Sequence, residues 1–434
     1  MISSPWPASM DRGADGHVSI GGVRVEDLLA EFGSPLLVMD ETDFRARCRA
    51  YRHAFSGATV AYASKAWCTT GVIQIADEEG LWIDVVSGGE LHAVLRAGVD
   101  PERIVFHGNN KSVSELEHAV VVGVARIVVD SVEELHRIEA IGVANAKPIA
   151  CWLRITPGID AHTHEYVRTG HDDSKFGFSV ALGLADEAIE IALTLEHVDI
   201  VGVHAHIGSQ IFGTDPFVAN VDTLIELLAH WKAGHDLTIA EMNIGGGMAI
   251  RYTHEDHPVG VQRYGDAVIA AVADACGRHH FPRPTLFVEP GRALVGPTTL
   301  TLYTVGTVKK LPGIRTFVSV DGGMSDNIRP ALYKAEHEVI VVNRHGSETV
   351  VPMTVVGKHC ESGDLVRERA PLPDDITAGD VLAVAATGAY TASMASNYNL
   401  LSRPAAVLVS DGAVRLLMRR ESIDEILARD VSIR

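Results

Sequence analysis

The segment AYASKAW, residues 61–67, places one lysine among small and apolar residues. An isolated buried ammonium is costly, and the usual response of a lysine in such surroundings is a lowered pKa. A lysine with a lowered pKa is a nucleophile toward carbonyl groups. The alternative is that Lys65 extends its ammonium to a surface while its stem stays packed. Lys65 is therefore a candidate nucleophile whose role depends on the rest of the chain.

Two glycine-containing segments follow apolar strands late in the first part of the chain, GGG at 245–247 and EPGR at 289–292. Consecutive glycines let backbone N–H groups approach an anion closely, and Gly291 beside Arg292 offers the same on the next loop. A tight turn before a helix is the alternative for GGG. Because phosphate is commonly held by the last two loops of a parallel barrel, we expect a phosphate site here.

Glu289 ends the apolar stretch TLFVE, so its carboxylate needs a cationic or N–H partner. That partner could be a nearby arginine or the protonated nitrogen of a heterocycle. In GVHAHIGSQ, strand periodicity brings His204 and His206 to one face. Two histidines suggest a metal, but no HExxH motif and no cluster of further carboxylates at neighbouring strand ends supports one. We therefore expect no metal, with one imidazole stacked on a flat ligand and the other packed.

The elements that must position these residues repeat a short strand, a polar loop and an amphipathic stretch. The expected strands are ATVAYASKA, WIDVVSGGE, RIVFHGNN, RIVVDS, IACWLRITPG, IVGVHAHIGSQ, EMNIGGG and TLFVEPGR. Helices are expected at 112–123 and 131–142, where a serine precedes a glutamate by three residues, as in a capping box. Eight strands alternating with helices predict a (β/α)8 TIM-type barrel within an α/β fold.

After Arg292 the pattern changes to strand-like segments separated by Gly, Pro and Asp turns, which predicts an antiparallel β domain. We expect the barrel at residues 34–295 and the C-terminal β domain at 296–434, with residues 1–33 contributing to it. A chain of 434 residues is long enough for two such domains.

Composition limits the partners. With 37 Lys+Arg against 56 Asp+Glu, the formal net charge of −19 disfavours nucleic acid and anionic membranes as partners. The five cysteines are widely spaced, without a CxxC pair, and no signal peptide or membrane span is visible. A cytoplasmic protein is the expectation.

A lysine, a phosphate cradle, a stacking imidazole and a glutamate for a ring nitrogen together describe a pyridoxal phosphate site in a barrel. The chain resembles the pyridoxal-phosphate-dependent decarboxylases of the alanine-racemase-like type, and among them the diaminopimelate decarboxylases, over roughly residues 20 to 430. The motifs that carry the resemblance are YASKA, VVSGGEL, HGNNKS, DSKFGF, HAHIGSQ, IGGG, EPGR, RPALY, CESGD and GAYTASMASNYN. Single motifs of this kind are weak, but the ordered series is specific.

The resemblance implies a role for each matching residue. Lys65 matches the lysine that holds pyridoxal phosphate, His206 the histidine stacked on its ring, and Cys360 the proton donor. The matching contacts to the phosphate or the pyridine nitrogen are Ser209, Gly247, Glu289, Gly291, Arg292 and Tyr390. The matching substrate-binding residues are Arg292, Arg329, Tyr333, Tyr390 and Glu361, of which Glu361 receives the distal ammonium.

The implied reaction is decarboxylation of meso-2,6-diaminopimelate to L-lysine, the last step of lysine biosynthesis, in a homodimer with shared active sites. Racemases of this barrel type carry arginine where this chain has Glu289, which favours a decarboxylase. Another basic amino acid or a polyamine precursor (ornithine, arginine or carboxynorspermidine) is the competing substrate. The competing functions are a non-catalytic pyridoxal phosphate binder and a metal-dependent barrel hydrolase. KAW at 65–67 and ALYKAEH at 331–337 depart from the family pattern and leave fine specificity open.

Overall fold

The computed structural model describes residues 4–159 and 174–434 of the chain. The chain divides into two compact units. The barrel unit comprises residues 47–249 and 258–291, and the sheet unit comprises residues 2–46, 250–257 and 292–434. The chain thus passes from one unit to the other between Gly291 and Arg292. Asp173, the first residue of the DSKFGF motif, and residues 1–3 lie outside the described residues.

The barrel unit is built on a closed ring of parallel strands. The strands are β5 (Thr59–Ala63), β6 (Trp82–Val85), β7 (Ile104–Phe106), β8 (Arg126–Val129), β9 (Ile149–Thr156), β11 (Val198–His204), β12 (Glu241–Asn243) and β13 (Thr285–Val288). The ring closes because β13 pairs with β5 and β8 pairs with β9. The predicted eight-stranded barrel is therefore confirmed. A short additional strand, β10 (Phe178–Ser179), pairs with β9.

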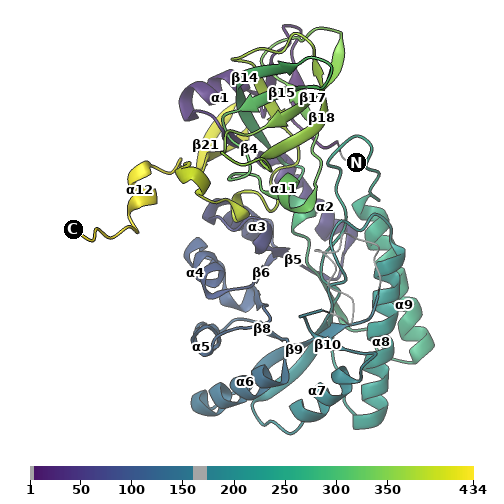
Figure 1. Cartoon of the computed structure of the whole chain (residues 1–434). Helices are drawn as coiled ribbons and strands as arrows, with labels where there is room; N and C mark the ends of the chain where they lie inside the picture. The colour runs from purple at the N-terminus through teal and green to yellow at the C-terminus, as the bar shows by residue number, and fades with distance from the viewer. Residues whose placement is uncertain (1–3, 160–173) are drawn as a thin grey trace. The chain divides into compact units, whose positions relative to one another are not determined.

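Helices surround these strands on the outside (Figure 1). They are α3 (Thr70–Glu78), α4 (Gly88–Ala97), α5 (Val113–Val122), α6 (Val132–Asn145), α7 (Leu184–Ala192), α8 (Asp215–His235) and α9 (Val261–His279). Ser112 and Glu115 form the expected capping box at the start of α5. At α6, Ser131 accepts from the backbone of Glu134, but the Glu134 carboxylate turns to the Asp130 N–H at 2.9 Å instead of closing the box.

Most strand residues of the barrel are buried on both faces, as expected for parallel strands covered by helices. Inside the ring, the apolar cluster consists of Val105, Val128, Trp152 and Phe287. Gly202 leaves room for the Trp152 ring, since a Cβ on Gly202 would lie 2.4 Å from Trp152 Cδ1. The packed interior supports the strand ends that carry the polar residues.

The sheet unit contains a nine-stranded sheet and a small three-stranded one. The large sheet consists of β4 (Leu36–Asp40), β14 (Thr299–Leu311), β15 (Arg315–Val320), β16 (Val339–Val341), β17 (Val350–Val356), β18 (Leu365–Pro373), β19 (Val381–Val384), β20 (Ala405–Ser410) and β21 (Ala413–Met418). The small sheet consists of β1 (Asp11–Arg12), β2 (Val18–Ile20) and β3 (Val23–Arg24). Its helices are α1 (Val25–Phe32), α10 (Arg292–Val295), α11 (Arg329–Tyr333) and α12 (Ile423–Leu427), and α2 (Glu41–Ala54) runs from this unit into the barrel unit.

The large sheet differs from the expected antiparallel one in two pairings, since β15 with β17 and β20 with β4 are parallel. The strand β18 was not predicted, because LVRERAPLP has charges and prolines that disfavour a strand. Strand β4 lies between β14 and β20, so residues 36–40 belong with the sheet, whereas the sequence placed the start of the barrel at residue 34. No helix within the described residues combines the length and the apolarity needed to cross a membrane.

Candidate active site

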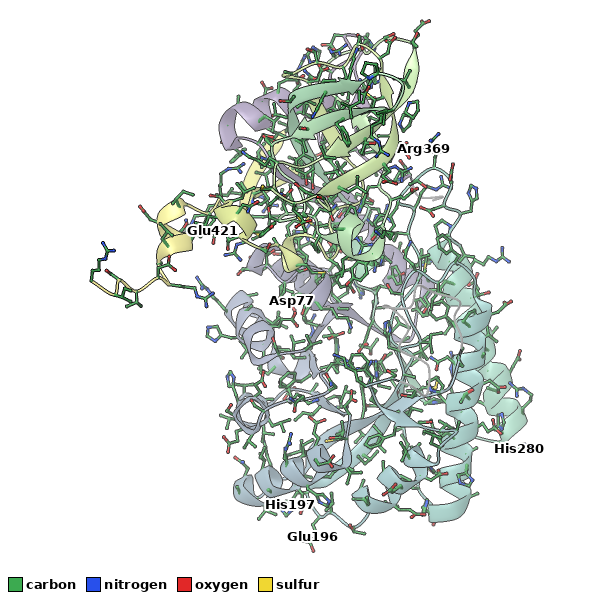
Figure 2. All side chains as sticks on the ribbon, in the orientation of Figure 1. Asp77, Glu196, His197, His280, Arg369 and Glu421 are labelled. Atoms are coloured by element: carbon green, nitrogen blue, oxygen red, sulfur yellow. The ribbon has the colours of Figure 1, made fainter. Side chains whose placement is uncertain are left out.

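The carboxyl ends of the barrel strands carry a set of polar side chains. Because the strands are parallel, residues that end them gather at one mouth of the barrel. Figure 2 labels Glu196 and His197 on the loop that enters β11, which marks the opposite end of that strand from His204. The side chains at or just after the strand ends are Lys65, Asp84, His107, His204, Asn243 and Glu289.

Glu289 is the centre of a buried hydrogen-bond network. Its Oε1 receives His107 Nε2 at 2.8 Å and Asn243 Nδ2 at 2.6 Å, and its Oε2 receives His204 Nε2 at 3.2 Å. Burial opposes the charge of this carboxylate, yet the two imidazoles outweigh burial and hold the pKa of Glu289 well below its ordinary value. A carboxylate offers about four acceptor positions, so Glu289 keeps capacity for one more N–H donor.

The two histidines of this network are buried and pack against each other. Their rings meet edge to face, with centroids 4.7 Å apart. Burial lowers the pKa of His204 to about 3. His107, His204 and Glu289 also present one donor atom each within 4.8 Å of one another, a set that could hold a metal. The 2.8 Å contact between His107 and Glu289 is a direct hydrogen bond, which is shorter than the spacing of two ligands around a zinc ion.

Lys65 follows β5 in a short 3-10 turn, Ser64–Ala66. Its Nζ lies 3.9 Å from Asp84 Oδ2, and its side chain is 37% exposed while Asp84 is fully buried. Neither carboxylate oxygen of Asp84 has a hydrogen-bond partner among the described residues. Burial raises the pKa of Asp84. The lysine therefore lies just after the end of an apolar strand with a buried acid beside it.

The loop after β12 brings glycine backbone against His206. The N–H of Gly246 lies 3.3 Å from His206 Nδ1, so this nitrogen accepts. A Cβ on Gly246 would lie 2.1 Å from the carbonyl oxygen of Glu289, and one on Gly247 2.3 Å from that of Gly208. Gly247 also has φ +117°, a conformation that favours glycine. His206 and Ser209 lie half-buried on the loop after β11, while Gly291 packs against Ala63.

The sheet unit holds a second cluster, made of two buried arginines and several tyrosines. Arg292 donates to the Tyr252 hydroxyl, and its guanidinium lies 4.8 Å from the centre of the Tyr390 ring. The Arg329 guanidinium lies 5.0 Å from the Tyr252 ring centre and 5.6 Å from that of Tyr333. Tyr252 thus connects the two arginines that the sequence assigned to substrate carboxylates.

Arg329 is the less satisfied of the two cations. It is 5% exposed, and its Nε has no hydrogen-bond partner among the described residues. Burial is the main cause that lowers the pKa of Arg329, and the neighbouring Arg292 adds to it. A buried guanidinium without an anion is costly, so this arrangement fits a site that receives a carboxylate from a ligand.

Cys360 and Glu361 lie elsewhere in the sheet unit, on the loop between β17 and β18. Both residues are exposed. The N–H of Cys360 donates to Asn399 Oδ1 at 3.0 Å, and Glu361 Oε1 accepts from the Gly363 N–H at 3.1 Å. The structure therefore groups the predicted residues into the barrel mouth, the arginine–tyrosine cluster and this loop.

Several residues of these clusters were missed from sequence. Asp84, His107 and Asn243 each stand at or just after the end of a strand, the same position that drew attention to Lys65 and Glu289. Applying that rule to every strand would have found them. Tyr252 carries no such signal, since it lies in a loop, and neither does the buried His337, which precedes a strand of the sheet and whose ring meets that of Tyr252 edge to face with centroids 5.0 Å apart.

Comparison with known proteins agrees with this geometry. The family described as "Pyridoxal-dependent decarboxylase, pyridoxal binding domain" matches residues 41–296. The family described as "Pyridoxal-dependent decarboxylase, C-terminal sheet domain" matches residues 272–388. The diaminopimelate decarboxylase of Bacillus subtilis is 45% identical over 420 residues, covering 96% of this chain and 95% of the relative.

Two further relatives extend the comparison. The diaminopimelate decarboxylase of Mycobacterium tuberculosis is 47% identical over 435 residues, covering 98% of this chain and 97% of the relative. The crystal structure of the M. jannaschii diaminopimelate decarboxylase with L-lysine has a TM-score of 0.91 at 32% identity and covers 98% of both chains. With two matching domains and relatives of this similarity over nearly its whole length, the chain belongs to the pyridoxal-dependent decarboxylase family.

Proposed function

We propose that the chain decarboxylates meso-2,6-diaminopimelate to L-lysine and CO2, the last step of lysine biosynthesis. The observation that carries the proposal is the pair of buried arginines joined by Tyr252 in the sheet unit, because diaminopimelate brings two carboxylates. Ornithine and arginine have one carboxylate each, so neither could give a carboxylate to both arginines of this pair. The diaminopimelate decarboxylases at 45–47% identity support the same substrate.

The barrel mouth fits pyridoxal phosphate, the cofactor of this family. Lys65 offers an amine for the aldehyde, and Glu289 keeps an acceptor position for a ring N–H. Gly246, Gly247 and Gly291 have no room for a Cβ against neighbouring backbone and side-chain atoms. Backbone N–H groups of such glycine-containing loops are the groups that hold a phosphate. When bound, the cofactor supplies a ring that withdraws electrons from the carbon that loses CO2.

In the barrel unit, Lys65 would hold the cofactor through its amine. Glu289, whose pKa is held low, would stay anionic and keep a proton on the ring nitrogen. His206 would stack on the ring, with its Nδ1 oriented by Gly246. Ser209, Gly247 and Gly291 would hold the phosphate, and Arg292 and Tyr390 of the sheet unit are the other proposed phosphate contacts.

Residues of the sheet unit bind the substrate and complete the reaction. Arg329 and Arg292 pair with carboxylates, with Tyr333 and Tyr390 beside them. Glu361 receives the ammonium at the distal stereocentre, and the Cys360 thiol delivers the proton that replaces CO2. Because Cys360 and Glu361 are exposed on a loop, they are available to a second copy of the chain.

The active form is a homodimer in which each site takes Lys65 from one chain and Cys360 from the other. Its test mixes two inactive variants, Lys65→Ala and Cys360→Ala, by co-expression. A mixed dimer has one intact site, so random pairing returns about a quarter of wild-type activity. Inactivity of confirmed mixed dimers would show that each site is built from one chain. A reducing cytoplasm is the proposed compartment, since the five cysteines form no disulfide in the structure.

The substrate is tested by direct competition. Purified protein with cofactor is given equal amounts of isotopically labelled meso-diaminopimelate and unlabelled L-lysine, L-ornithine and L-arginine, and the labelled and unlabelled amine products are measured. We expect L-lysine from meso-diaminopimelate as the dominant product. A preference for ornithine or arginine would show that the proposed substrate is wrong, but it would leave the proposed decarboxylation in place. Absence of a borohydride-sensitive yellow absorbance would contradict the cofactor itself.

A further inference from the structure

The loop that carries Cys360 has an exposed tip and a buried base. Cys360 and Glu361 are exposed, whereas the His359 and Asp364 side chains are 0% and 3% exposed. The tip holds the groups proposed to act on the substrate. The base contains a histidine and a carboxylate that take no part in the proposed reaction itself.

Asp364 ties the two ends of this loop together. Its Oδ2 accepts from the His359 N–H at 2.8 Å and from His359 Nδ1 at 2.7 Å. Its Oδ1 accepts from the Met324 N–H at 2.7 Å, and its backbone carbonyl accepts from the Gly357 N–H at 3.1 Å. One residue therefore fixes the loop to a neighbouring segment and closes it on itself.

Two glycines make room for the Asp364 carboxylate. A Cβ on Gly323 would lie 2.4 Å from Asp364 Oδ1, and one on Gly357 would lie 2.2 Å from Asp364 Oδ2. Gly323 also has φ +149°. Both contacts are far closer than side-chain atoms allow, so the backbone is shaped around this carboxylate.

Three consecutive backbone N–H groups before and at the cysteine each have a defined acceptor. Lys358 donates to the Gly322 carbonyl at 3.0 Å, His359 to Asp364, and Cys360 to Asn399 Oδ1 at 3.0 Å. The His359 ring also lies nearly parallel to the Tyr398 ring, at 4° and 5.6 Å between centroids. The direction in which the Cys360 side chain leaves the backbone is thereby fixed.

The segment that carries Asn399 is itself held in place. Its neighbour Asn397 donates to the Glu421 carboxylate, which also pairs with Arg403 at 2.7 Å. Glu421 is labelled in Figure 2, shortly before α12. The N–H of Ser396 donates to the Ser325 carbonyl at 2.8 Å. Asn399 has φ 55°, which asparagine tolerates better than most residues.

We propose that His359, Asp364 and Asn399 are positioning residues that aim the Cys360 thiol at the carbon that has lost CO2. The inference rests on the proposed function, in which Cys360 is the proton donor. In that step the bond from the reacting carbon to the carboxylate breaks and CO2 leaves. The electron pair left on the carbon takes the thiol proton, and the thiolate recovers a proton from water.

Asn399 offers the sharpest test because it is exposed and its loss leaves the base of the loop intact. Asn399→Gly removes the acceptor but keeps a residue that accepts positive φ, and Asn399→Asp restores an acceptor oxygen. Asp411→Gly is the matched control, since Asp411 has φ 50° in the same unit at the turn between β20 and β21. Each holoenzyme is assayed for kcat, KM and, in D2O, the configuration of deuterium at the new CH2 of lysine.

We expect Asn399→Gly to lower kcat by about ten- to a hundredfold, with KM and bound cofactor unchanged. Its product should carry deuterium in mixed configuration, whereas wild type, Asn399→Asp and Asp411→Gly give a single one. Wild-type kcat and a single configuration in Asn399→Gly would overturn the inference. Cys360→Ala distinguishes a failure of the proposed proton-donor role from a failure of the positioning role. If it keeps wild-type turnover and configuration, the proton-donor role fails, and if it loses both while Asn399→Gly loses neither, only the positioning role fails.

Discussion

The two buried charge clusters of the molecule are satisfied in different ways. In the barrel unit, Glu289 receives three hydrogen bonds from the chain itself, so its charge is compensated within the fold. In the sheet unit, Arg329 is equally buried but keeps an Nε without a partner among the described residues. The difference is the one expected if Glu289, as proposed, acts on a resident cofactor and Arg329 binds an incoming substrate.

This difference has an energetic consequence. A buried ion with its partners in place is stable without ligand, whereas a buried ion lacking one reduces stability until a ligand supplies it. Changes in the barrel cluster should therefore lower turnover. Removal of the unsatisfied cation from the arginine cluster should weaken substrate binding but leave the free energy of unfolding equal or higher.

Lys65→Ala should have the largest effect of any single change in the barrel cluster. Loss of the amine removes the attachment point of the cofactor, so we expect turnover to fall by at least about a thousandfold. Borohydride reduction followed by peptide mass spectrometry should find the reduced cofactor on Lys65 in wild type and on no residue in the variant. Lys310→Ala, at an exposed position of β14, is the control and should keep full activity. Label on another lysine would contradict the assignment.

Glu289→Gln should slow turnover by about 10²–10³-fold while the cofactor stays bound. The amide has no charge to keep the ring nitrogen protonated, and its NH2 group faces either His204 or the pair His107 and Asn243, where an acceptor oxygen was. Steady-state kcat and the absorbance of bound cofactor measure the two effects. In Glu241→Gln, the loss of the 2.6 Å pair with Arg126 at the start of β12 should reduce stability and spare kcat. Normal kcat in Glu289→Gln would reduce Glu289 to a packing role.

Arg329→Met should raise KM for meso-diaminopimelate by about 10–100-fold through loss of a charge-assisted hydrogen bond. The same change removes a buried cation that lacks a full set of partners, so the free energy of unfolding should stay equal or rise. Arg344→Met makes the matched comparison, because Arg344 is paired with Asp380 at 2.6 Å and Asp375 at 2.8 Å. That variant should lose stability and keep its KM. Equal destabilisation of both variants would show that Arg329 is satisfied within the fold.

His337 should give the smallest effect, visible as a dependence of stability on pH. Burial, with Arg329 as the next cause, lowers the pKa of His337 to about 3, from an ordinary value of 6.5. Below pH 6.5 the unfolded chain therefore binds a proton at His337 that the folded chain does not bind, so the free energy of unfolding falls as the pH drops. At pH 5.5 this difference in protonation lowers the free energy of unfolding by about 1.4 kcal/mol. Urea unfolding of wild type and His337→Gln between pH 8 and 5.5 should show that the difference between them changes by this amount. A constant difference would assign the histidine an ordinary pKa.

The barrel could be predicted from sequence because its signal is local and repeated. Each strand is a short apolar run that ends in a polar residue, and parallel strands place those ends together. Lys65 and Glu289 were found in this way. His107 and Asn243 were missed, and His204 was singled out without its bond to Glu289, because the resemblance supplied a role for the glutamate without requiring the residues that hold it.

The sheet unit was harder to predict because its pairings connect distant segments. Nothing in Leu36–Asp40 indicates that it pairs with Thr299–Leu311 and Ala405–Ser410. The Tyr252 hydroxyl meets Arg292 across 40 residues of sequence, and Asp364 requires glycines at both 323 and 357. Such contacts are set by the tertiary arrangement and leave little trace in local periodicity.

The position of β4 has a consequence for how the chain matures during synthesis. This strand is synthesised before the barrel residues, yet its sheet neighbours are β14 and β20, which follow the barrel in the chain. Both edges of β4 can be paired only after β20, which ends at Ser410, has emerged from the ribosome. The barrel residues, all encoded before residue 292, can fold while translation of the later sheet strands continues. The nascent chain must therefore carry an apolar strand, LLVMD, unpaired on at least one edge until β20 has been synthesised.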